Sequence, residues 1–385
     1  MIFRDEIHGD IELSNAELRL VRTKAFERMR YIKQLAFAEY EYAGATHNRY
    51  QHSLGVCQCI TDMYNAVNKN SPDFFQEGDL ELLRMMALVH DLGHSPFSHA
   101  SEVLSDITHE ERLTDILRSL RKDIILPINS SVEAWDLVNQ VYQGDGYMYI
   151  SNPHYQVLHT FMDGFIDADK LDYLERDALN CGVSYGIFDR QDLINNLCIL
   201  RDNKGREVLG IKEEGIQALE SFILARYYMF NKVYFNPQER IYRYQYVETM
   251  QKLLPNGKYP DDVKKFLALD DTKYVRKLPF LLNSAYRLVY DTEFDAKVKQ
   301  AVESKLGNLI LCDTPKKVVF RRDASDITVW VKNSITGAVV PCDEVSPIIK
   351  GIQFANVHKL RFYTQSSVEA EVREQVLKIV KGVKR

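Results

Sequence analysis

A histidine and an aspartate stand together at the end of an apolar predicted helix. The segment 80–89 is rich in aliphatic residues and methionine, and His90 and Asp91 follow it directly. Burying two ionisable groups side by side is costly unless a cation lies between them, and a divalent metal ion would meet that need. Imidazole and carboxylate ligands suit Mn, Fe, Ni, Zn or Mg better than copper or an iron–sulfur cluster. The pair therefore indicates a metal centre.

Other candidate ligands lie elsewhere in the chain. His94 and His99 follow the pair closely, His52 opens a second predicted helix, and Asp169 lies in a carboxylate-rich stretch of a third. A lone His-Asp dipeptide is more often a helix-end aspartate beside a half-buried histidine than a metal site. Three helices that bring a histidine, a His-Asp pair and an aspartate to one place favour the metal site.

Helical periodicity dominates the elements that must position these residues. Segments with apolar residues three or four apart predict helices at 16–38, 52–67, 80–90, 130–141, 155–177, 191–199 and 215–233. The alternating segment 2–13 predicts a strand or hairpin arm before Ser14, which caps the first helix. Signals for parallel strands are missing. The first 300 residues are therefore expected to be mostly α.

The periodicity changes near residue 313. Segments 317–322 and 327–332 alternate, 333–337 reads as a turn, 359–363 as a strand and 368–381 as a closing helix. We therefore expect a mostly α protein with a helical core at 1–300, including an N-terminal arm at 1–13, and a small α+β lobe at 301–385. Proline and glycine punctuate 120–153, where we expect a lid.

Composition excludes several classes of protein. The chain has 385 residues, 45% hydrophobic and 27% charged, so it is neither disordered nor collagen-like. A net charge of −5 is too weakly acidic to identify a partner. The six cysteines form no CxxC pair, the start carries no export signal, and no apolar run reaches the roughly 18 residues of a membrane span. We expect a cytoplasmic protein with reduced thiols and no membrane association.

Several longer motifs carry a family resemblance. These motifs are Asp5-Glu6-Ile7-His8-Gly9 and the segments 30–35, 44–56, 90–99 and 167–173. With them the sequence resembles the HD-domain metal-dependent phosphohydrolases, whose signature is H…HD…D, and within that family the deoxynucleoside triphosphate triphosphohydrolases. The resemblance covers about residues 1–240. It implies an HD-domain helical core and hydrolysis of dNTPs to deoxynucleoside and triphosphate.

The resemblance also implies roles around the metal. One divalent ion would be held by His52, His90, Asp91 and Asp169. A second Mg could accompany the triphosphate. The catalytic group would be His94, His99, His109 and Glu102. One of its histidines would protonate the departing 5′ oxygen, and the glutamate stands where the family usually has an aspartate that orients a catalytic histidine.

Contacts to the phosphates follow from the same resemblance. Arg49, Lys170 and Arg226 match family positions that meet the triphosphate. Phe230 stands where a family enzyme has a histidine near the base and sugar, so base preference is open. Arg22 replaces an acidic residue that reads guanine in an activator site. We therefore expect no activation by GTP or dGTP, and a GTP-dependent rise in turnover would contradict this.

Contacts to the sugar are implied as well. Gln34 and Asp177 match groups that hold the 3′-hydroxyl. Leu35 and Tyr234 match a tight wall under C2′ that leaves no room for a ribose hydroxyl, and Tyr173 would stack beneath the sugar. Each residue alone has an ordinary structural explanation, and only their joint order in the chain carries weight.

Alternatives remain. The same metal site would serve a phosphodiesterase or nuclease acting on cyclic or oligomeric nucleotides, and a third hypothesis is a nucleotide-sensing module without turnover. Aromatic and basic residues across 226–246 would suit single-stranded nucleic acid. We favour core and subunit interface there, in a homodimer or homotetramer. The basic cluster Lys316, Lys317, Arg321 and Arg322 is by default a solvated face, with a regulatory anion site as the alternative.

Overall fold

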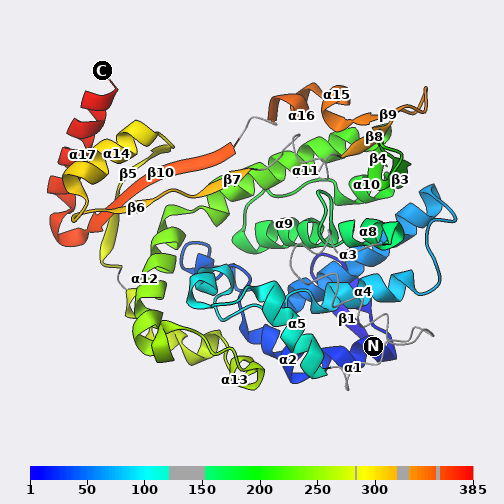
Figure 1. Cartoon of the computed structure of the whole chain (residues 1–385), viewed down its shortest axis with the longest axis horizontal. Helices are drawn as coiled ribbons and strands as arrows, with labels where there is room; N and C mark the ends of the chain where they lie inside the picture. The colour runs from blue at the N-terminus through cyan, green and yellow to red at the C-terminus, as the bar shows by residue number, and fades with distance from the viewer. Residues whose placement is uncertain (121–151, 282–283, 319–328, 353–355, 385) are drawn as a thin grey trace.

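Helices form most of the chain in the computed structural model (Figure 1), which describes residues 1–120, 152–281, 284–318, 329–352 and 356–384. The mostly α fold class is therefore confirmed. The predicted helix 130–141 and most of the expected lid lie outside the described residues. The helices before residue 281 are α1 (Asn15–Val21), α2 (Lys24–Arg28), α3 (Arg49–Asn70), α4 (Asp79–Val89), α5 (His109–Leu120), α8 (Pro153–Thr160), α9 (Ala168–Cys181), α10 (Arg190–Asn195), α11 (Ile216–Met229), α12 (Pro237–Leu253) and α13 (Val263–Leu267).

The N-terminal arm is the predicted hairpin. Strands β1 (Ile2–Asp5) and β2 (Gly9–Glu12) pair antiparallel. Ser14 then caps α1: its side chain accepts a hydrogen bond from the backbone of Glu17, whose carboxylate accepts one from the Ser14 backbone in return. Reciprocal capping of this kind gives hydrogen-bond partners to two backbone amides that have none within the helix.

The predicted helix 16–38 is wrong as a single element. Helix α1 ends at Val21, and Thr23 caps α2 by accepting from Phe26 N. Beyond a 3₁₀ turn at Met29–Tyr31, Ile32 is extended, and Lys33 N donates to the carboxylate of Asp271 at 2.9 Å. A partner 238 residues away thus draws the backbone out of the helix, and periodicity cannot reveal it.

Two other predicted helices are also interrupted. In 155–177 the chain breaks between α8 and α9, and Asp167 caps α9 by accepting from Lys170 N at 2.8 Å. In 191–199 only the first residues are helical, because β3 (Leu197–Arg201) follows and pairs antiparallel with β4 (Glu207–Lys212). The sequence prediction missed this sheet.

The chain returns to the helical core late in the sequence. Strand β8 (Trp330–Lys332) pairs parallel with β4 and antiparallel with β9 (Val339–Pro341), which completes the sheet order β3-β4-β8-β9. The predicted turn at 333–337 joins β8 and β9. The short helices α15 (Cys342–Val345) and α16 (Pro347–Ile352) follow, and Cys342 and Ile349 belong to the main core.

A second sheet builds the C-terminal lobe at the left of Figure 1. Strand β10 (Asn356–Gln365) pairs antiparallel with β5 (Tyr286–Glu293), β6 (Leu311–Asp313) and β7 (Lys316–Val318). Helices α14 (Ala296–Leu306) and α17 (Glu369–Val383) pack together beside this sheet and share its apolar cluster. The predicted strand at 359–363 and closing helix are confirmed. A domain boundary at residue 300 stays a prediction, and β5, which joins the lobe sheet, begins before it.

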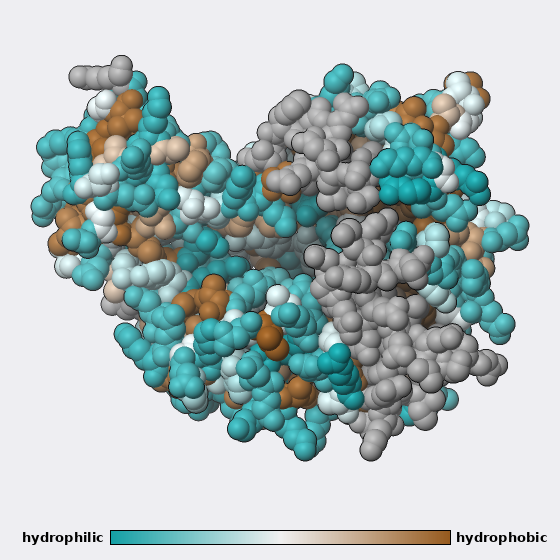
Figure 2. All heavy atoms as spheres, in the orientation of Figure 1, coloured by the Kyte–Doolittle hydropathy of each residue, from teal (hydrophilic) through white to brown (hydrophobic). Residues whose placement is uncertain are grey.

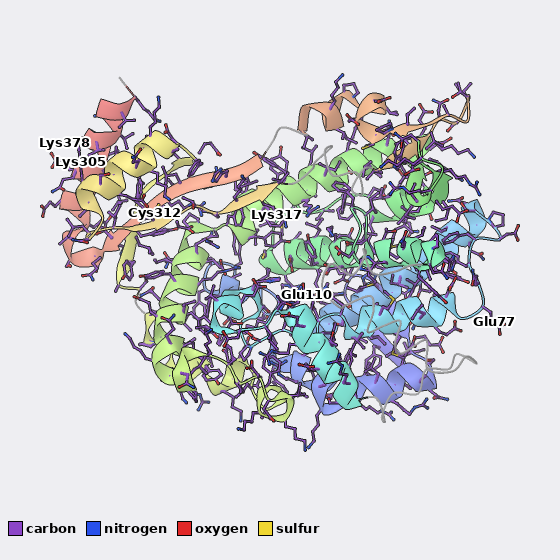
Figure 3. The ribbon with its side chains drawn as sticks, in the orientation of Figure 1. Glu77, Glu110, Lys305, Cys312, Lys317 and Lys378 are labelled. Atoms are coloured by element: carbon purple, nitrogen blue, oxygen red, sulfur yellow. The ribbon has the colours of Figure 1, made fainter. Side chains whose placement is uncertain are left out.

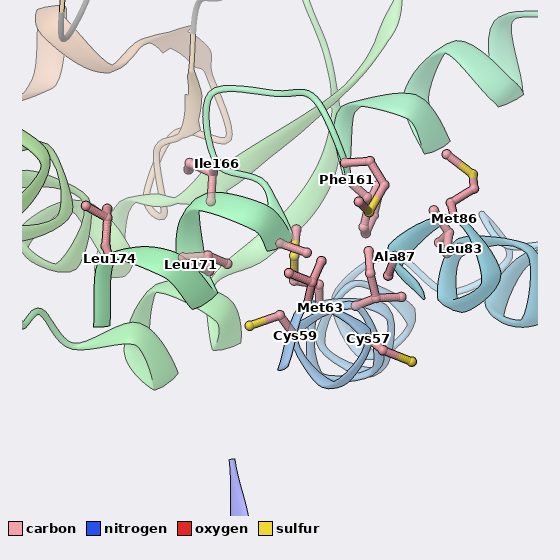
Figure 4. Close-up of a cluster of buried hydrophobic side chains, with 14 of the residues drawn as sticks. Cys57, Cys59, Met63, Leu83, Met86, Ala87, Phe161, Ile166, Leu171 and Leu174 are labelled. Atoms are coloured by element: carbon pink, nitrogen blue, oxygen red, sulfur yellow. The ribbon is translucent and has the colours of Figure 1, made fainter. Parts of the chain in front are cut away.

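The three helices that carry the candidate metal ligands pack against one another in the main core. Figure 4 shows apolar side chains of α3, α4 and α9 meeting in one cluster. They include Cys57, Met63, Leu83, Ala87 and Leu171. All six cysteines lie in the described part of the chain and are unpaired. Over the same residues, no helix combines the length and hydrophobicity that crossing a membrane requires.

Candidate active site

Three helices bring candidate metal ligands together. His52 lies in the first turn of α3, His90 caps the end of α4, and Asp169 lies in the first turn of α9. Their ligand atoms all lie within 4.8 Å of one another. The Nε2 atom of His52 is 2.9 Å from Asp169 Oδ1 and 3.3 Å from His90 Nε2. Residues separated by more than 100 positions thus form one compact donor set.

Asp91 lies at the edge of this group. Its carboxylate oxygens are 3.4 Å from His90 Nε2 and 3.7 Å from His52 Nε2. One oxygen accepts from Arg49 Nη1 at 2.6 Å, and the other lies 3.2 Å from His94 Nε2. Burial acts to raise the pKa of Asp91, but Arg49 and the histidines hold it well below its usual range. Asp91 is therefore a carboxylate shared between the donor set and Arg49.

The remaining ring nitrogens set the tautomers of both histidines. His90 Nδ1 lies 2.7 Å from the carbonyl oxygen of Ala87, which can only accept, so this nitrogen carries the proton. His52 Nδ1 lies 2.7 Å from Asp172 Oδ2, and the same argument applies. In a neutral ring, Nε2 is then the nitrogen that each histidine can offer to a metal. Partners of this kind are what metal-ligating histidines have in proteins.

The charge of the site also suits a cation. Burial lowers the pKa of His52, yet Asp169 and Asp172 outweigh it and raise that pKa to about 10. The site thus stabilises a positive charge between the half-buried carboxylate of Asp169 and the buried carboxylate of Asp172. A divalent ion suits this environment and the nitrogen and oxygen donors, so the residues fit the metal that the sequence predicts.

Asp172 is a site residue that the sequence analysis missed. It lies one turn after Asp169 on α9, and its carboxylate also meets His8 Nε2 at 2.7 Å and the guanidinium of Arg176 at 2.8 Å. Gly55 on α3 permits this arrangement, since a Cβ there would come within 1.9 Å of Asp172 Oδ1. The three-residue spacing of the two aspartates, which places them on one helix face, was the available signal.

The predicted catalytic histidines lie beside this donor set. The ring of His94 stacks on that of His109, with centroids 4.2 Å apart, and the ring of His99 is 4.9 Å from His94. Burial first, and then Arg49, hold the pKa of His94 well below its usual range. Burial also lowers the pKa of His109. Gly93 lets its segment approach the start of α5 closely, because a Cβ at Gly93 would lie 1.9 Å from the His109 carbonyl oxygen.

Glu102 contacts one histidine of this group more closely than the other. Its Oε1 atom lies 2.5 Å from His99 Nδ1 and 3.8 Å from His109 Nδ1. Burial acts to raise the pKa of Glu102, but the hydrogen bond with His99 and nearby positive charge lower it overall. The carboxylate is therefore placed to orient His99.

The three predicted phosphate-binding cations differ in their hydrogen-bond and ion-pair partners. Arg49 is 2% exposed and is held by Asp91 and by Ser98 Oγ. Lys170 pairs with Asp167 and donates to the Gly164 carbonyl oxygen at 3.0 Å. Arg226 is 8% exposed, and its Nε atom has no hydrogen-bond partner among the described residues.

The predicted sugar-binding residues form a second group. Asp177 is fixed at both oxygens, by His47 Nε2 and by the Tyr234 hydroxyl, each at 2.7 Å. The rings of Tyr173 and Tyr234 meet edge to face, with centroids 6.1 Å apart. The buried Oε1 atom of Gln34 has no hydrogen-bond partner in the described part of the chain.

Leu35, the residue after Gln34, is partly buried and packs against the main core. Arg49 contacts Asp91, and Lys170 follows Asp169 directly on α9, so these two predicted substrate residues adjoin the donor set. The roles of all the predicted substrate residues stay predictions.

Two family models match the chain. The HD domain matches residues 49–142, and the HD associated region matches residues 188–289. Among curated proteins, the chain is 34% identical over 247 residues to the uncharacterized protein YwfO of Bacillus subtilis, covering 62% of this chain and 52% of that protein. It is 28% identical over 266 residues to the deoxynucleoside triphosphate triphosphohydrolase SAMHD1 of Danio rerio, covering 60% of this chain and 42% of that protein.

These alignments span about half the length of the curated relatives. A solved structure matches over nearly the whole chain. It is a hypothetical protein from Aquifex aeolicus, with a TM-score of 0.83 and 26% identity, and the match covers 98% of this chain and 99% of that chain. His52 and His90 lie within the residues that match the HD domain, and Asp169 lies between the two matched segments. The chain therefore contains a segment that matches the HD domain, followed by a segment that matches the HD-associated region.

Proposed function

We propose that this protein is a divalent-metal-dependent phosphohydrolase that cleaves dNTPs into deoxynucleoside and triphosphate. One observation carries the proposal: a donor set suited to a divalent cation lies next to a histidine group and to cations suited to phosphates. Asp91 links these parts, since it contacts His90, His94 and Arg49. The similarity of the chain to the deoxynucleoside triphosphate triphosphohydrolase SAMHD1 of Danio rerio supports the choice of dNTPs.

The metal would be held by His52, His90, Asp91 and Asp169, and when bound it would supply Lewis-acid activation of water and of the phosphoryl group. The other residues would bind and orient the substrate. Lys170 and Arg226 would neutralise charge on the phosphates, with Arg49 holding Asp91 in place. Such cations act most strongly where, as for the buried Arg226 Nε, water is excluded.

Proton transfer would fall to the histidine group. Glu102 would hold the proton on His99 Nδ1, which leaves the Nε2 atom of His99 to exchange a proton with the leaving 5′ oxygen. The lowered pKa values of His94 and His109 favour neutral rings that accept or donate hydrogen bonds without added charge. Asp177, fixed by His47 and Tyr234, would accept from the sugar 3′-hydroxyl.

Product analysis tests the proposal. Purified protein, supplied with Mn²⁺, is incubated with dNTPs, NTPs, cyclic nucleotides and oligonucleotides, and the products are separated by chromatography. Deoxynucleoside plus inorganic triphosphate is the expected result. Nucleoside monophosphates released from a strand would favour the nuclease alternative, and nucleotide binding without hydrolysis would favour a sensing module.

Replacing both His90 and Asp91 by alanine tests the site. The double variant should lose at least about 100-fold in rate, because the metal supplies several kcal/mol of transition-state stabilisation. His358→Ala is the matched control, since this histidine stacks on Phe294 in the C-terminal sheet. Unchanged hydrolysis in the double variant would show that the site is elsewhere.

Three finer assignments belong to the proposal. We propose one of Mn, Fe, Ni, Zn and Mg as the metal, a homodimer or homotetramer as the assembly, and the cytoplasm as the location. Metal analysis of the purified protein tests the first and light scattering the second. The unpaired state of the cysteines supports the third.

A further inference from the structure

Lys317 comes from the C-terminal lobe but faces the HD-domain core. It lies on β7, where it pairs with Val357 of β10. Its neighbour Lys316 is exposed, whereas Lys317 is half-buried, as expected for adjacent residues on opposite faces of a strand. Lys316 thus fits the solvated face expected for this cluster, and Lys317 does not. Arg321 and Arg322 lie outside the described residues.

The figures show where this side chain lies. Figure 2 shows a hollow on this face of the molecule between the C-terminal lobe and the helical core. Figure 3 places Lys317 near the middle of the molecule, beside the helices of the core, and Glu110 of α5 below it. Glu110 is the residue after His109 and lies 3.1 Å from the His109 Nε2 atom. The positive charges of Arg226 and Lys170 act on Lys317, so Lys317 lies near two of the predicted phosphate-binding residues.

Phe230 joins Lys317 to a predicted phosphate-binding residue. The Nζ atom of Lys317 lies 5.0 Å from the centroid of the Phe230 ring, and the Arg226 guanidinium carbon lies 5.9 Å from the same centroid. Phe230 opens the π-helical turn Phe230–Tyr234, directly after α11, which carries Arg226. One aromatic ring therefore lies within cation–π distance of two cations from different parts of the chain.

The local charge is strongly positive. Burial lowers the pKa of Lys317 to about 8, and the positive charges of Arg226 and Lys170 add to this effect. In the described ranges, Arg226 and Lys317 have no carboxylate within 4 Å, and Lys170 has only Asp167. Three cations with one acidic partner in a partly buried place repel one another unless an anion joins them. The unpartnered, buried Nε atom of Arg226 offers such an anion a hydrogen bond.

We propose that Lys317 contacts the phosphate chain of the nucleotide bound at the HD site, so that the C-terminal lobe completes a phosphate-binding group with Lys170 and Arg226. This inference rests on the proposed function and adds a substrate-binding residue from the C-terminal lobe. It gives the lobe a role in recognising the number of phosphates. A triphosphate carries more charge than a monophosphate and can span more of these cations.

The test compares two neighbouring lysines. Lys317→Met should raise the Kd for inorganic tripolyphosphate, measured by calorimetry, and the KM for dNTPs by about 10-fold, as expected for loss of one charge-assisted contact. Lys316→Met removes the same charge from the exposed face of β7 and should change both constants less than about twofold. Lys317→Arg should restore most of the binding. Circular dichroism confirms that each variant is folded.

Phosphate number decides the outcome. Lys317→Met should weaken the binding of tripolyphosphate, measured as an inhibitor, more than it weakens the binding of a dNMP. Equal losses for dNMP and tripolyphosphate, or equal losses in the Lys316 and Lys317 variants, would overturn the inference. If wild-type protein hydrolyses no dNTP while Lys317→Met still loses tripolyphosphate binding selectively, the proposed function fails and the anion site stands. If dNTPs are hydrolysed but neither constant changes, only the inference fails.

Discussion

The imidazole of His52 donates through Nδ1 to Asp172 Oδ2 at 2.7 Å, so a residue outside the donor set determines how a candidate metal ligand points. The same carboxylate meets His8 of the N-terminal hairpin and Arg176 of α9. Burial acts to raise the pKa of Asp172, but Arg176 and the two histidines hold it well below its usual range. Asp172 therefore stays an anion that supports the His52 ring.

Replacing Asp172 by asparagine should weaken metal binding. We expect the Kd for Mn²⁺ to rise roughly 10- to 100-fold, because the second partner of a ligating histidine sets its tautomer and basicity. Calorimetric titration with Mn²⁺ measures this. Asp202→Asn is the matched control, since Asp202 pairs with Arg206 four residues later, as Asp172 does with Arg176, but in the β3–β4 turn. An unchanged Kd for Mn²⁺ in Asp172→Asn would contradict the role given to Asp172.

Gly55 should not tolerate a side chain. A Cβ at this position would lie 1.9 Å from Asp172 Oδ1 and 2.3 Å from Arg176 Nη2, so Gly55→Ala must displace a buried ion pair. We expect a loss of about 1–3 kcal/mol in the free energy of unfolding, measured with urea. Gly382→Ala in α17 meets nothing within 4 Å and should leave that free energy unchanged or slightly higher. Equal stability of both variants would show that a side chain at position 55 does not displace the ion pair.

The buried pair of Glu17 and Arg84 should make stability depend on pH. Its atoms Oε1 and Nε are 2.6 Å apart, and the side chains are only 6% and 12% exposed. Burial acts to raise the pKa of Glu17, but Arg84 and the Ser14 backbone lower it overall. Because the pKa of Glu17 is lower in the folded state, the pair stabilises the fold fully at pH values above the unfolded-state pKa, about 4.3. This stabilisation is lost as the pH falls through the folded-state pKa.

Glu17→Gln tests this linkage. At pH 7 we expect the variant to be about 3–5 kcal/mol less stable, since it leaves Arg84 buried without its anion. The difference from wild type should shrink as pH falls below about 4. Urea unfolding between pH 7 and pH 3.5 measures both. The exposed pair of Glu374 and Lys378 supplies the control, because Glu374→Gln should change stability little at any pH. A difference that stays constant with pH would exclude the linkage.

Asp177 should discriminate the sugar 3′-hydroxyl. Both of its oxygens are fixed, by His47 and by Tyr234, so the carboxylate is already oriented. Asp177→Ala should lower kcat/KM for a dNTP by roughly 10- to 100-fold, as for a lost hydrogen bond to a charged group. The loss should be much smaller for the matching dideoxynucleotide, which lacks the hydroxyl. Equal losses on both substrates would give Asp177 a purely structural role.

The elements that the sequence predicted correctly depend on neighbours in the chain. The hairpin arm, the cap at Ser14, α3, α4 and the closing helix α17 follow from alternation, helical spacing and local capping groups. The order of the motifs around His52, His90 and Asp169 allowed the family resemblance to be seen in the sequence. Short-range hydrogen bonds and periodicity are encoded locally, which is why they could be read without a structure.

Only the tertiary structure decided features whose partners are distant in the chain. Asp271 draws Lys33 out of a predicted helix, and β8 returns to pair with β4 across more than 100 residues. Asp172 becomes a supporting residue through His8 and His52, and Lys317 turns inward to Phe230 although its neighbour faces solvent. Long-range hydrogen bonds, strand pairing and burial of charge depend on which surfaces meet on folding, and no local pattern specifies that meeting.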